Sequence, residues 1–236
     1  FLCGTSAGLA ANLPRIARAD QPRSPNDQIA VGLIGAGIRG QALAKDLPAD
    51  ARVVAICDCY QPRLDEVKAL IPKVKFREFN DYRQMIEQPG LDAVIITAPD
   101  HHHVLAAMLA CRAGLDVYCE KPLSLTIGEG KALVSAVRKY RRVLQVGSQQ
   151  RSMEWDQFAC RFVREGGLGE VSHVEVQNWP GPLTDEVLPQ EPVPAGLDWD
   201  LFLGQAPSRP HHWRYWLKDQ RLHKGERWRG WDMWRQ

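Results

Sequence analysis

From residue 28 to about residue 150, short apolar runs alternate with longer segments of helical periodicity. This alternation predicts βαβ units around a parallel sheet. One run is almost continuously apolar, as expected of a central strand covered on both faces. We therefore predict an α/β fold with a doubly wound parallel Rossmann sheet. Its six strands are expected at Ile29–Ile34, Arg52–Asp58, Val74–Phe76, Leu91–Ala98, Leu115–Cys119 and Arg142–Gly147.

The segments between these runs begin with residues that favour the first turn of a helix. Proline fits the first turn because its missing N–H would have no partner there, and short polar side chains cap the free N–H groups. The expected start signals are Pro62, Asn80 or Asp81, Asp100, and Ser124 or Thr126.

The pattern changes after residue 150. An amphipathic helix is predicted over Met153–Arg164, followed by an alternating strand over Glu170–Trp179. Alternation implies one exposed and one buried face, so this strand should belong to an antiparallel sheet. No second run of this quality follows, although seven of the eight tryptophans lie after residue 170. We expect residues 151–236 to begin an α+β substrate domain that is truncated at its C-terminus.

The first twenty residues differ from the rest of the chain. A stretch of small and apolar residues leads to Ala17-Arg18-Ala19, which resembles the second half of an export signal with its cleavage site. The stretch is too short to span a bilayer. We expect an exported or periplasmic protein that has lost the charged start of its signal; an unstructured extension of a cytoplasmic protein is the alternative.

The composition limits the classes of binding partner that are expected. The chain of 236 residues is 44% hydrophobic, enough for a folded core, and its 30 basic and 28 acidic residues give a net charge of +2. Without a basic stripe, nucleic acid is not an expected partner, and no membrane anchor is visible outside the N-terminal segment. The six cysteines show no zinc-binding spacing and are expected to be small buried residues. A small-molecule substrate is therefore expected, with no metal site.

The first predicted strand runs directly into a Gly-x-Gly-x-x-Gly sequence. Gly35 permits a tight turn, Gly37 lets the backbone approach a pyrophosphate, and Gly40 lets the next helix pack against the strand. The free N–H groups at the helix start favour phosphate oxygens. The second strand ends in Asp58, 18 positions after Gly40, where a ribose-binding carboxylate belongs. Together these features predict a dinucleotide site.

The choice between NAD and NADP depends on charges near the ribose. Asp58 favours NAD because it accepts from the 2′-hydroxyl and repels a 2′-phosphate. Either Arg63 or Arg39 could instead favour NADP by reaching that phosphate. NAD is the predicted cofactor, with NADP as the alternative.

Ligands of doubly wound sheets lie beyond the carboxyl ends of the strands, where the strand order reverses. The fourth strand leads there into Pro99 and three histidines, His101–His103. Consecutive histidines suggest a metal, but neighbours at a helix start point in different directions, and no carboxylate cluster accompanies them. We predict a cofactor or substrate contact here, with solvated capping residues as the alternative.

The fifth strand leads into Glu120-Lys121-Pro122, and Lys121 is the candidate catalytic residue. A lysine beside a cofactor in a shielded cleft can bind a substrate hydroxyl and share in proton transfer. A surface lysine paired with Glu120 is the alternative. Function is favoured because Pro122 stiffens the turn and the strand end places Lys121 over the cleft.

These motifs together resemble the glucose-fructose oxidoreductase and inositol 2-dehydrogenase family (Gfo/Idh/MocA) over about residues 28 to 210. The resemblance implies a cofactor site at Gly35, Ala36, Gly37, Ile38, Arg39, Gly40, Asp58, Pro99, His103 and Glu120, and substrate contacts at Lys121, Gln149 and Arg151. The segments that carry it are Gly35–Gly40, Ala93–His103, Glu120–Ser124, Gln145–Arg151 and Leu197–Asp200.

The family implies an NAD(P)-dependent oxidoreductase that acts on a sugar or polyol hydroxyl by hydride transfer, and a homo-oligomer if the second domain is complete. Members also carry an Asp and a His in the second domain, which this sequence does not reach. The tail from Arg227 to Trp234 resembles the approach to them. We therefore expect an incomplete catalytic set. An NAD-dependent glycosidase and a cofactor-binding protein without turnover are the alternatives.

Overall fold

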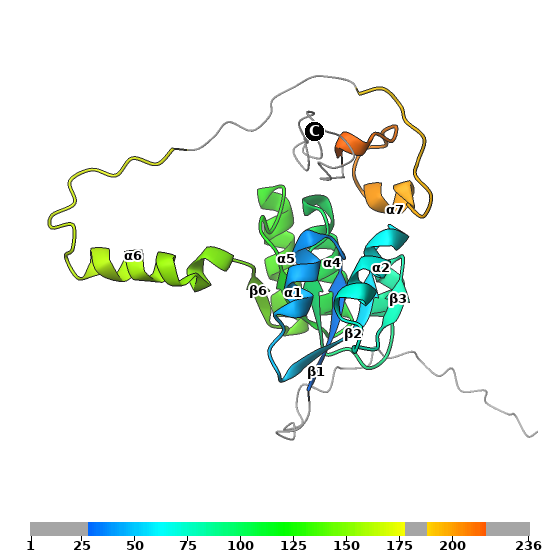
Figure 1. Cartoon of the computed structure of the whole chain (residues 1–236), viewed down its shortest axis with the longest axis horizontal. Helices are drawn as coiled ribbons and strands as arrows, with labels where there is room; N and C mark the ends of the chain where they lie inside the picture. Colours follow the sequence, from blue (N-terminus) through cyan, green and yellow to red (C-terminus); the bar gives the residue numbers. More distant parts are fainter. Residues whose placement is uncertain (1–27, 178–187, 216–236) are drawn as a thin grey trace, which may run out of the picture.

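The computed structural model describes residues 28–177 and 188–215, and a six-stranded parallel sheet forms its centre (Figure 1). The order β3-β2-β1-β4-β5-β6 reverses between β1 and β4, which confirms the predicted doubly wound topology. The strands are β1 (Ile29–Ile34), β2 (Ala51–Cys57), β3 (Arg77–Phe79), β4 (Ala93–Ile96), β5 (Asp116–Cys119) and β6 (Leu144–Val146).

Helices cover both faces of the sheet. Neighbouring side chains of a strand point to opposite faces, so Leu33 packs in the core beneath α1 and α2, whereas Ile34 packs beneath α3, α4 and α5. The central strand β4 is buried between β1 and β5, as its apolar run predicted. The helices are α1 (Ile38–Lys45), α2 (Gln61–Leu70), α3 (Tyr82–Ile86), α4 (Asp100–Arg112) and α5 (Ile127–Tyr140).

Most of the predicted helix starts are confirmed. Pro62 lies in the first turn of α2, and the Asp81 side chain accepts from the N–H of Arg83 at the start of α3. The Thr126 side chain caps α5 in a capping box. Asp100 was wrong as a cap because it is already the first residue of α4; there its negative charge suits the helix N-terminus.

The third strand lies later than predicted. Residues 74–76 form a loop, and the N–H of Val74 donates to the carbonyl oxygen of Ile71 at 2.9 Å in a turn. The strand is Arg77–Phe79, a three-residue edge strand in which Arg77 and Glu78 are exposed. Such a strand buries too little to show an apolar pattern, which explains the wrong prediction.

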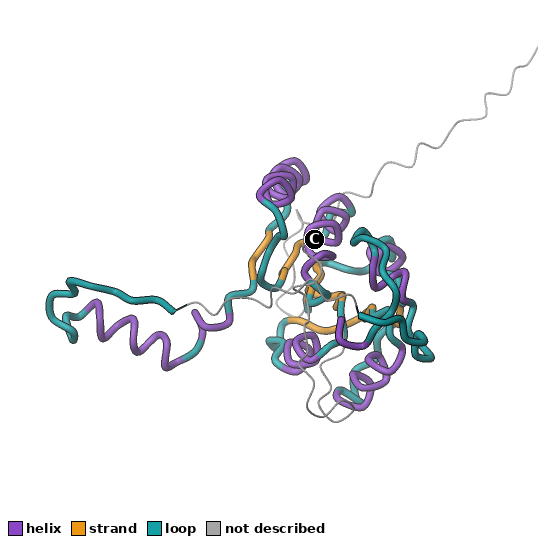
Figure 2. The backbone as a smooth tube through the Cα atoms, turned by 90° about the horizontal axis from the view of Figure 1, so that it is seen from above, coloured by secondary structure: helices purple, strands orange, loops and turns teal. Residues whose placement is uncertain are grey.

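Beyond β6 the chain leaves the sheet through η1 (Gln149–Ser152) and the predicted amphipathic helix, which forms as α6 (Glu154–Arg164). This helix stands away from the sheet, and none of its residues is buried (Figure 2). The strand predicted from Glu170 is wrong for the described residues 170–177, which pair with no other strand. A strand needs hydrogen-bonded neighbours, and the described residues supply none here. Residues 178 and 179 lie outside the description.

The segment 188–215 returns to the carboxyl ends of the strands and carries α7 (Trp199–Leu203) and η2 (Trp213–Tyr215) (Figure 1). Leu197 forms an antiparallel bridge with Tyr60 in the loop between β2 and α2. A separate apolar cluster fixes the segment there. It contains Leu188, Leu197, Trp199, Phe202, Leu203 and Tyr215, with Cys59, Tyr60 and Ala206 packed against it.

In the two described ranges, no helix combines the length and the apolar character needed to cross a membrane. The signal-like residues 1–20 and the tail from Arg227 to Trp234 lie outside those ranges, so export stays a prediction.

Candidate dinucleotide site

The glycine-rich turn between β1 and α1 leaves no room for side chains beneath it. Gly35 has φ +93°, and a Cβ there would lie 2.6 Å from the Ala98 nitrogen; a Cβ on Gly40 would overlap the carbonyl oxygen of Gly35. Gly37 faces open space, and no side chain caps the start of α1 after it. The turn therefore leaves bare backbone and a free helix N-terminus, which fit a pyrophosphate.

Asp58 lies beside this turn at the end of β2. One carboxylate oxygen accepts the N–H of Ala36 at 2.7 Å, and the other accepts the N–H of Tyr60 at 2.9 Å. Burial raises the pKa of Asp58, and these two backbone hydrogen bonds act in the opposite direction. Each oxygen keeps a further lone pair, so the carboxylate can still accept from ribose hydroxyls.

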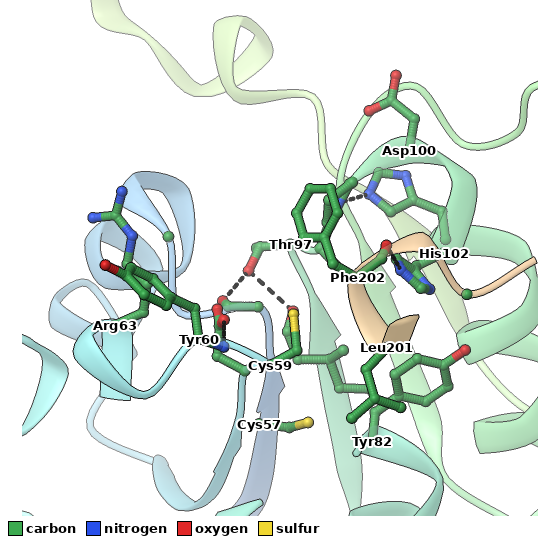
Figure 3. Close-up of a pocket in the computed structure, with 18 of the residues that line it drawn as sticks. Cys57, Cys59, Tyr60, Arg63, Tyr82, Thr97, Asp100, His102, Leu201 and Phe202 are labelled. Atoms are coloured by element: carbon green, nitrogen blue, oxygen red, sulfur yellow. Dashed lines mark hydrogen bonds between the residues drawn. The ribbon is translucent and has the colours of Figure 1, made fainter. Parts of the chain in front are cut away.

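A cavity of about 970 Å³ runs along the carboxyl ends of the strands and brings most of the predicted residues together (Figure 3). Ala36 and Gly40 lie beneath the turn rather than in the cavity wall, and Arg151 lies in η1 outside the cavity. The predicted residues that line the cavity are Gly35, Gly37, Ile38, Arg39, Asp58, Pro99, His103, Glu120, Lys121 and Gln149.

Arg39 and Glu120 form an ion pair at this cavity. Arg39 Nε lies 2.6 Å from Glu120 Oε1, and the Glu120 side chain is buried. Glu120 directly follows β5, and two strands separate β5 from β2, which Asp58 directly follows. Arg63 instead lines the cavity from α2 while it pairs with Glu66 at 2.7 Å. Of the two arginines considered for a 2′-phosphate, Arg63 is the one on the Asp58 side.

The three consecutive histidines are buried, so they are not solvated capping residues. His103 places its two ring nitrogens 2.7 Å from the Pro122 carbonyl oxygen and 2.8 Å from that of Ala98. This side chain therefore joins the loop after β4 to the loop that carries the candidate lysine. His101 and His102 turn their rings to a single carbonyl on α7.

Lys121 lies at the rim of the cavity, and its side chain is exposed. Its backbone N–H donates to Glu120 Oε2 at 3.2 Å, and the bond to Pro122 is cis. The expected shielding is absent among the described residues. The lysine is thus held at the backbone by Glu120, while its ammonium group is accessible to a small molecule in the cavity.

Sequence reasoning missed one wall of the cavity. Residues from the distant segment around α7 line it together with Tyr82 and Arg83 at the start of α3. The only sequence signal for this wall was the Leu197–Asp200 motif, which is part of the family resemblance but to which no binding role was assigned. The missed residues of this wall are Asp198, Asp200, Leu201, Phe202, Gly204 and Gln205.

A bare glycine turn, a carboxylate fixed at the second strand and a cavity over the point of strand reversal define a dinucleotide-binding α/β protein. The sequence model of the Gfo/Idh/MocA group, described as an oxidoreductase family with an NAD-binding Rossmann fold, matches residues 29–148. The chain belongs to this family, which confirms the predicted resemblance and the choice of NAD as cofactor.

Relatives with known names support this assignment. Inositol 2-dehydrogenase 1 of Saccharopolyspora erythraea is 37% identical over 128 residues, which are 52% of this chain and 37% of that protein. A glycosyl hydrolase family 109 protein of Stenotrophomonas maltophilia is 27% identical over 71% of this chain and 40% of its own length. The crystal structure of myo-inositol 2-dehydrogenase from Lactobacillus plantarum superposes with TM-score 0.57 at 26% identity, covering 61% of this chain and 43% of that one. The chain thus spans about two fifths of these relatives.

Proposed function

We propose that this protein is an NAD(H)-dependent oxidoreductase that acts on a hydroxyl group of a sugar or polyol. The observation that carries the proposal is one cavity lined by the glycine turn, Asp58 and Lys121. A lysine within reach of a dinucleotide site suits the handling of a hydroxyl proton. The names of the inositol dehydrogenase relatives support a polyol substrate.

In this mechanism the turn from Gly35 to Gly40, the N-terminus of α1 and Asp58 hold the dinucleotide. When bound, the nicotinamide group supplies the hydride acceptor. Lys121 Nζ donates a hydrogen bond to the substrate hydroxyl oxygen and stabilises the negative charge that develops as the hydroxyl proton passes to solvent water, which reaches this exposed side chain. The Gln149 side chain, which lines the same cavity, orients a neighbouring hydroxyl.

A panel of polyols and sugars tests the reaction. Each is mixed with the protein and NAD⁺, and NADH formation is followed by its absorbance. NADH formation with at least one cyclic polyol is expected. NAD⁺ binding in calorimetry without turnover on the whole panel would instead support a cofactor-binding protein with no reaction of its own.

Asp58→Ala is expected to weaken NAD⁺ binding by about 10- to 100-fold, because ribose hydrogen bonds to a charged group are lost. The preference for NAD⁺ over NADP⁺ is expected to fall as well, since the repulsion of a 2′-phosphate disappears. Isothermal calorimetry with both nucleotides measures the change. Asp65→Ala, an exposed carboxylate on α2, is the matched control and is expected to bind as the wild type does. Equal NAD⁺ affinity for the Asp58 variant would contradict this role.

An NAD-dependent glycosidase is the second candidate, because the glycosyl hydrolase family 109 relative matches 71% of this chain. A redox-assisted glycosidase needs no pair of carboxylates at the scissile bond. Release of free sugar from an aryl glycoside that requires NAD⁺ but yields no net NADH separates this reaction from simple dehydrogenation.

A further inference from the structure

Helix α7 is tied to the dinucleotide-binding sheet on both sides. Before the helix, the N–H of Asp198 donates to the Cys59 carbonyl at 2.9 Å, and the N–H of Gln61 donates to the Gly196 carbonyl at 2.9 Å. At its end, the Phe202 carbonyl faces two rings of α4. A five-residue helix has little stability of its own, so these contacts determine where α7 lies.

Two histidines converge on this one carbonyl. Nε2 of His101 lies 2.8 Å and Nε2 of His102 lies 2.9 Å from the Phe202 oxygen. The oxygen has two lone pairs and accepts both bonds when each ring carries its proton on Nε2. Both rings are almost fully buried, at 3% and 4% exposure. In the described part of the chain, Nδ1 of His102 has no hydrogen-bond partner.

The chain after α7 is fitted to the same two rings. The Gln205 side chain donates to the His101 carbonyl. Gly204 has φ +54°, and a Cβ there would overlap the His102 ring. The contact between α4 and α7 therefore depends on residues of both segments: the buried histidine donors of α4 and Gly204 after α7.

Helix α7 forms a wall of the cavity through Asp200, Leu201 and Phe202. The Phe202 carbonyl faces the His102 ring, and Leu201 lines the same cavity as Tyr82 (Figure 3). At the start of this wall, the N–H of Asp198 donates to the carbonyl of Cys59, the residue that follows Asp58. Because the strand-end carboxylate binds the adenosine ribose in such folds, α7 stands at the adenosine end of the site.

We infer that His101 and His102 are positioning residues for cofactor binding: by holding the Phe202 carbonyl they keep α7 in place as the wall of the adenosine end. This inference rests on the proposed binding of NAD to this cavity. Docking of α7 and binding of the adenosine half are then coupled, and each strengthens the other.

Hydrogen exchange of the full chain tests the coupling. NAD⁺ is expected to slow amide exchange in the peptide covering residues 197–204, and ADP-ribose, which lacks nicotinamide, is expected to do the same. Calorimetry on the same samples measures binding. If NAD⁺ binds but exchange in 197–204 is unchanged, the inference is overturned while the proposed cofactor use stands. If NAD⁺ does not bind at all, both are overturned.

Substitution on α4 tests the two histidines. His101→Leu with His102→Leu is expected to weaken NAD⁺ and ADP-ribose binding by about 10-fold or more, since two hydrogen bonds are lost. His101→Gln with His102→Gln, whose amide nitrogens can replace Nε2, is expected to stay within about threefold of the wild type. Arg112→Gln, an exposed change on the same helix, is the control. Wild-type affinity in the folded leucine variant, or no rescue by glutamine, would overturn the role.

Gly204→Ala tests the same contact by a change in the segment after α7 instead of in α4. It is expected to weaken both ligands and to speed exchange in 197–204, because the new methyl group meets the His102 ring. This variant and the exchange data on the wild type decide the question if the leucine variant fails to fold. Unchanged affinity and exchange in Gly204→Ala would count against the inference.

Discussion

Replacing Lys121 by alanine is expected to reduce the turnover number with the best polyol substrate by about 10²- to 10⁴-fold. The variant loses the Nζ donor at the substrate hydroxyl, so the charge that develops in the transition state is left without a partner. NAD⁺ affinity is expected to stay near that of the wild type, because the turn from Gly35 to Gly40 and Asp58 hold the dinucleotide. Steady-state kinetics and calorimetry measure the two quantities separately.

Two controls separate chemistry from folding in this experiment. Lys121→Arg keeps the positive charge but presents it on a larger, planar guanidinium instead of a single Nζ donor, so it is expected to recover substrate binding with little of the turnover. Lys131→Ala changes an exposed lysine on α5 and is expected to have wild-type kinetics. A Lys121→Ala variant with an unchanged turnover number would show that Lys121 is the surface residue of the alternative reading.

The part of the dinucleotide site that could be predicted from sequence lies in the first strand, the glycine turn and the following helix, where the local sequence determines the structure. Gly35 needs a positive φ and Gly40 needs contact with the backbone below it, so the glycine spacing encodes the turn directly. Asp58 follows a continuous apolar strand and is therefore placed by the sheet register. Such features depend on neighbours in sequence or on strand pairing, both of which leave a periodic signal.

The parts that could not be predicted depend on contacts between distant segments. Nothing around Phe202 indicates that its carbonyl meets His101 and His102, a hundred positions earlier in the chain. The strand expected from Glu170 failed for a related reason, because alternation reports a side-chain pattern and not the presence of a partner strand. In sequence, His101–His103 have the pattern of capping or ligand-binding residues, and only the fold shows that they are buried.

The same histidines are expected to make the fold sensitive to acid. Burial is the main cause that lowers the pKa of His101 from 6.5 to about 3, and the neighbouring His102 is the next largest. Burial also lowers the pKa of His102 from 6.5 to about 4. Both rings are therefore neutral in the folded protein and bind protons on unfolding. Arg209, Arg83 and the third ring, His103, act in the same direction as burial, whereas the bonds to the Phe202 carbonyl oppose it. Tyr82, which contacts His102, stays neutral over this range because burial raises its pKa to about 12.

The free energy of unfolding is consequently expected to fall as pH drops below 6.5. Each ring contributes a slope of about 1.4 kcal/mol per pH unit, which levels off near pH 4 for His102 and near pH 3 for His101. Above pH 6.5 the contribution is fully present. Urea unfolding followed by tryptophan fluorescence at pH 7, 6 and 5 measures the slope.

The variant with glutamine at both positions isolates this effect from the titration of carboxylates elsewhere. It keeps donors for the Phe202 carbonyl but has no group that titrates, so its loss of stability between pH 6 and pH 5 is expected to be smaller by about 2 to 3 kcal/mol. Equal slopes in the two proteins would mean that the rings take up protons without leaving α7. A smaller slope in the variant would assign this part of the acid sensitivity to the two rings that hold the cavity wall, because they take up protons only when the fold opens.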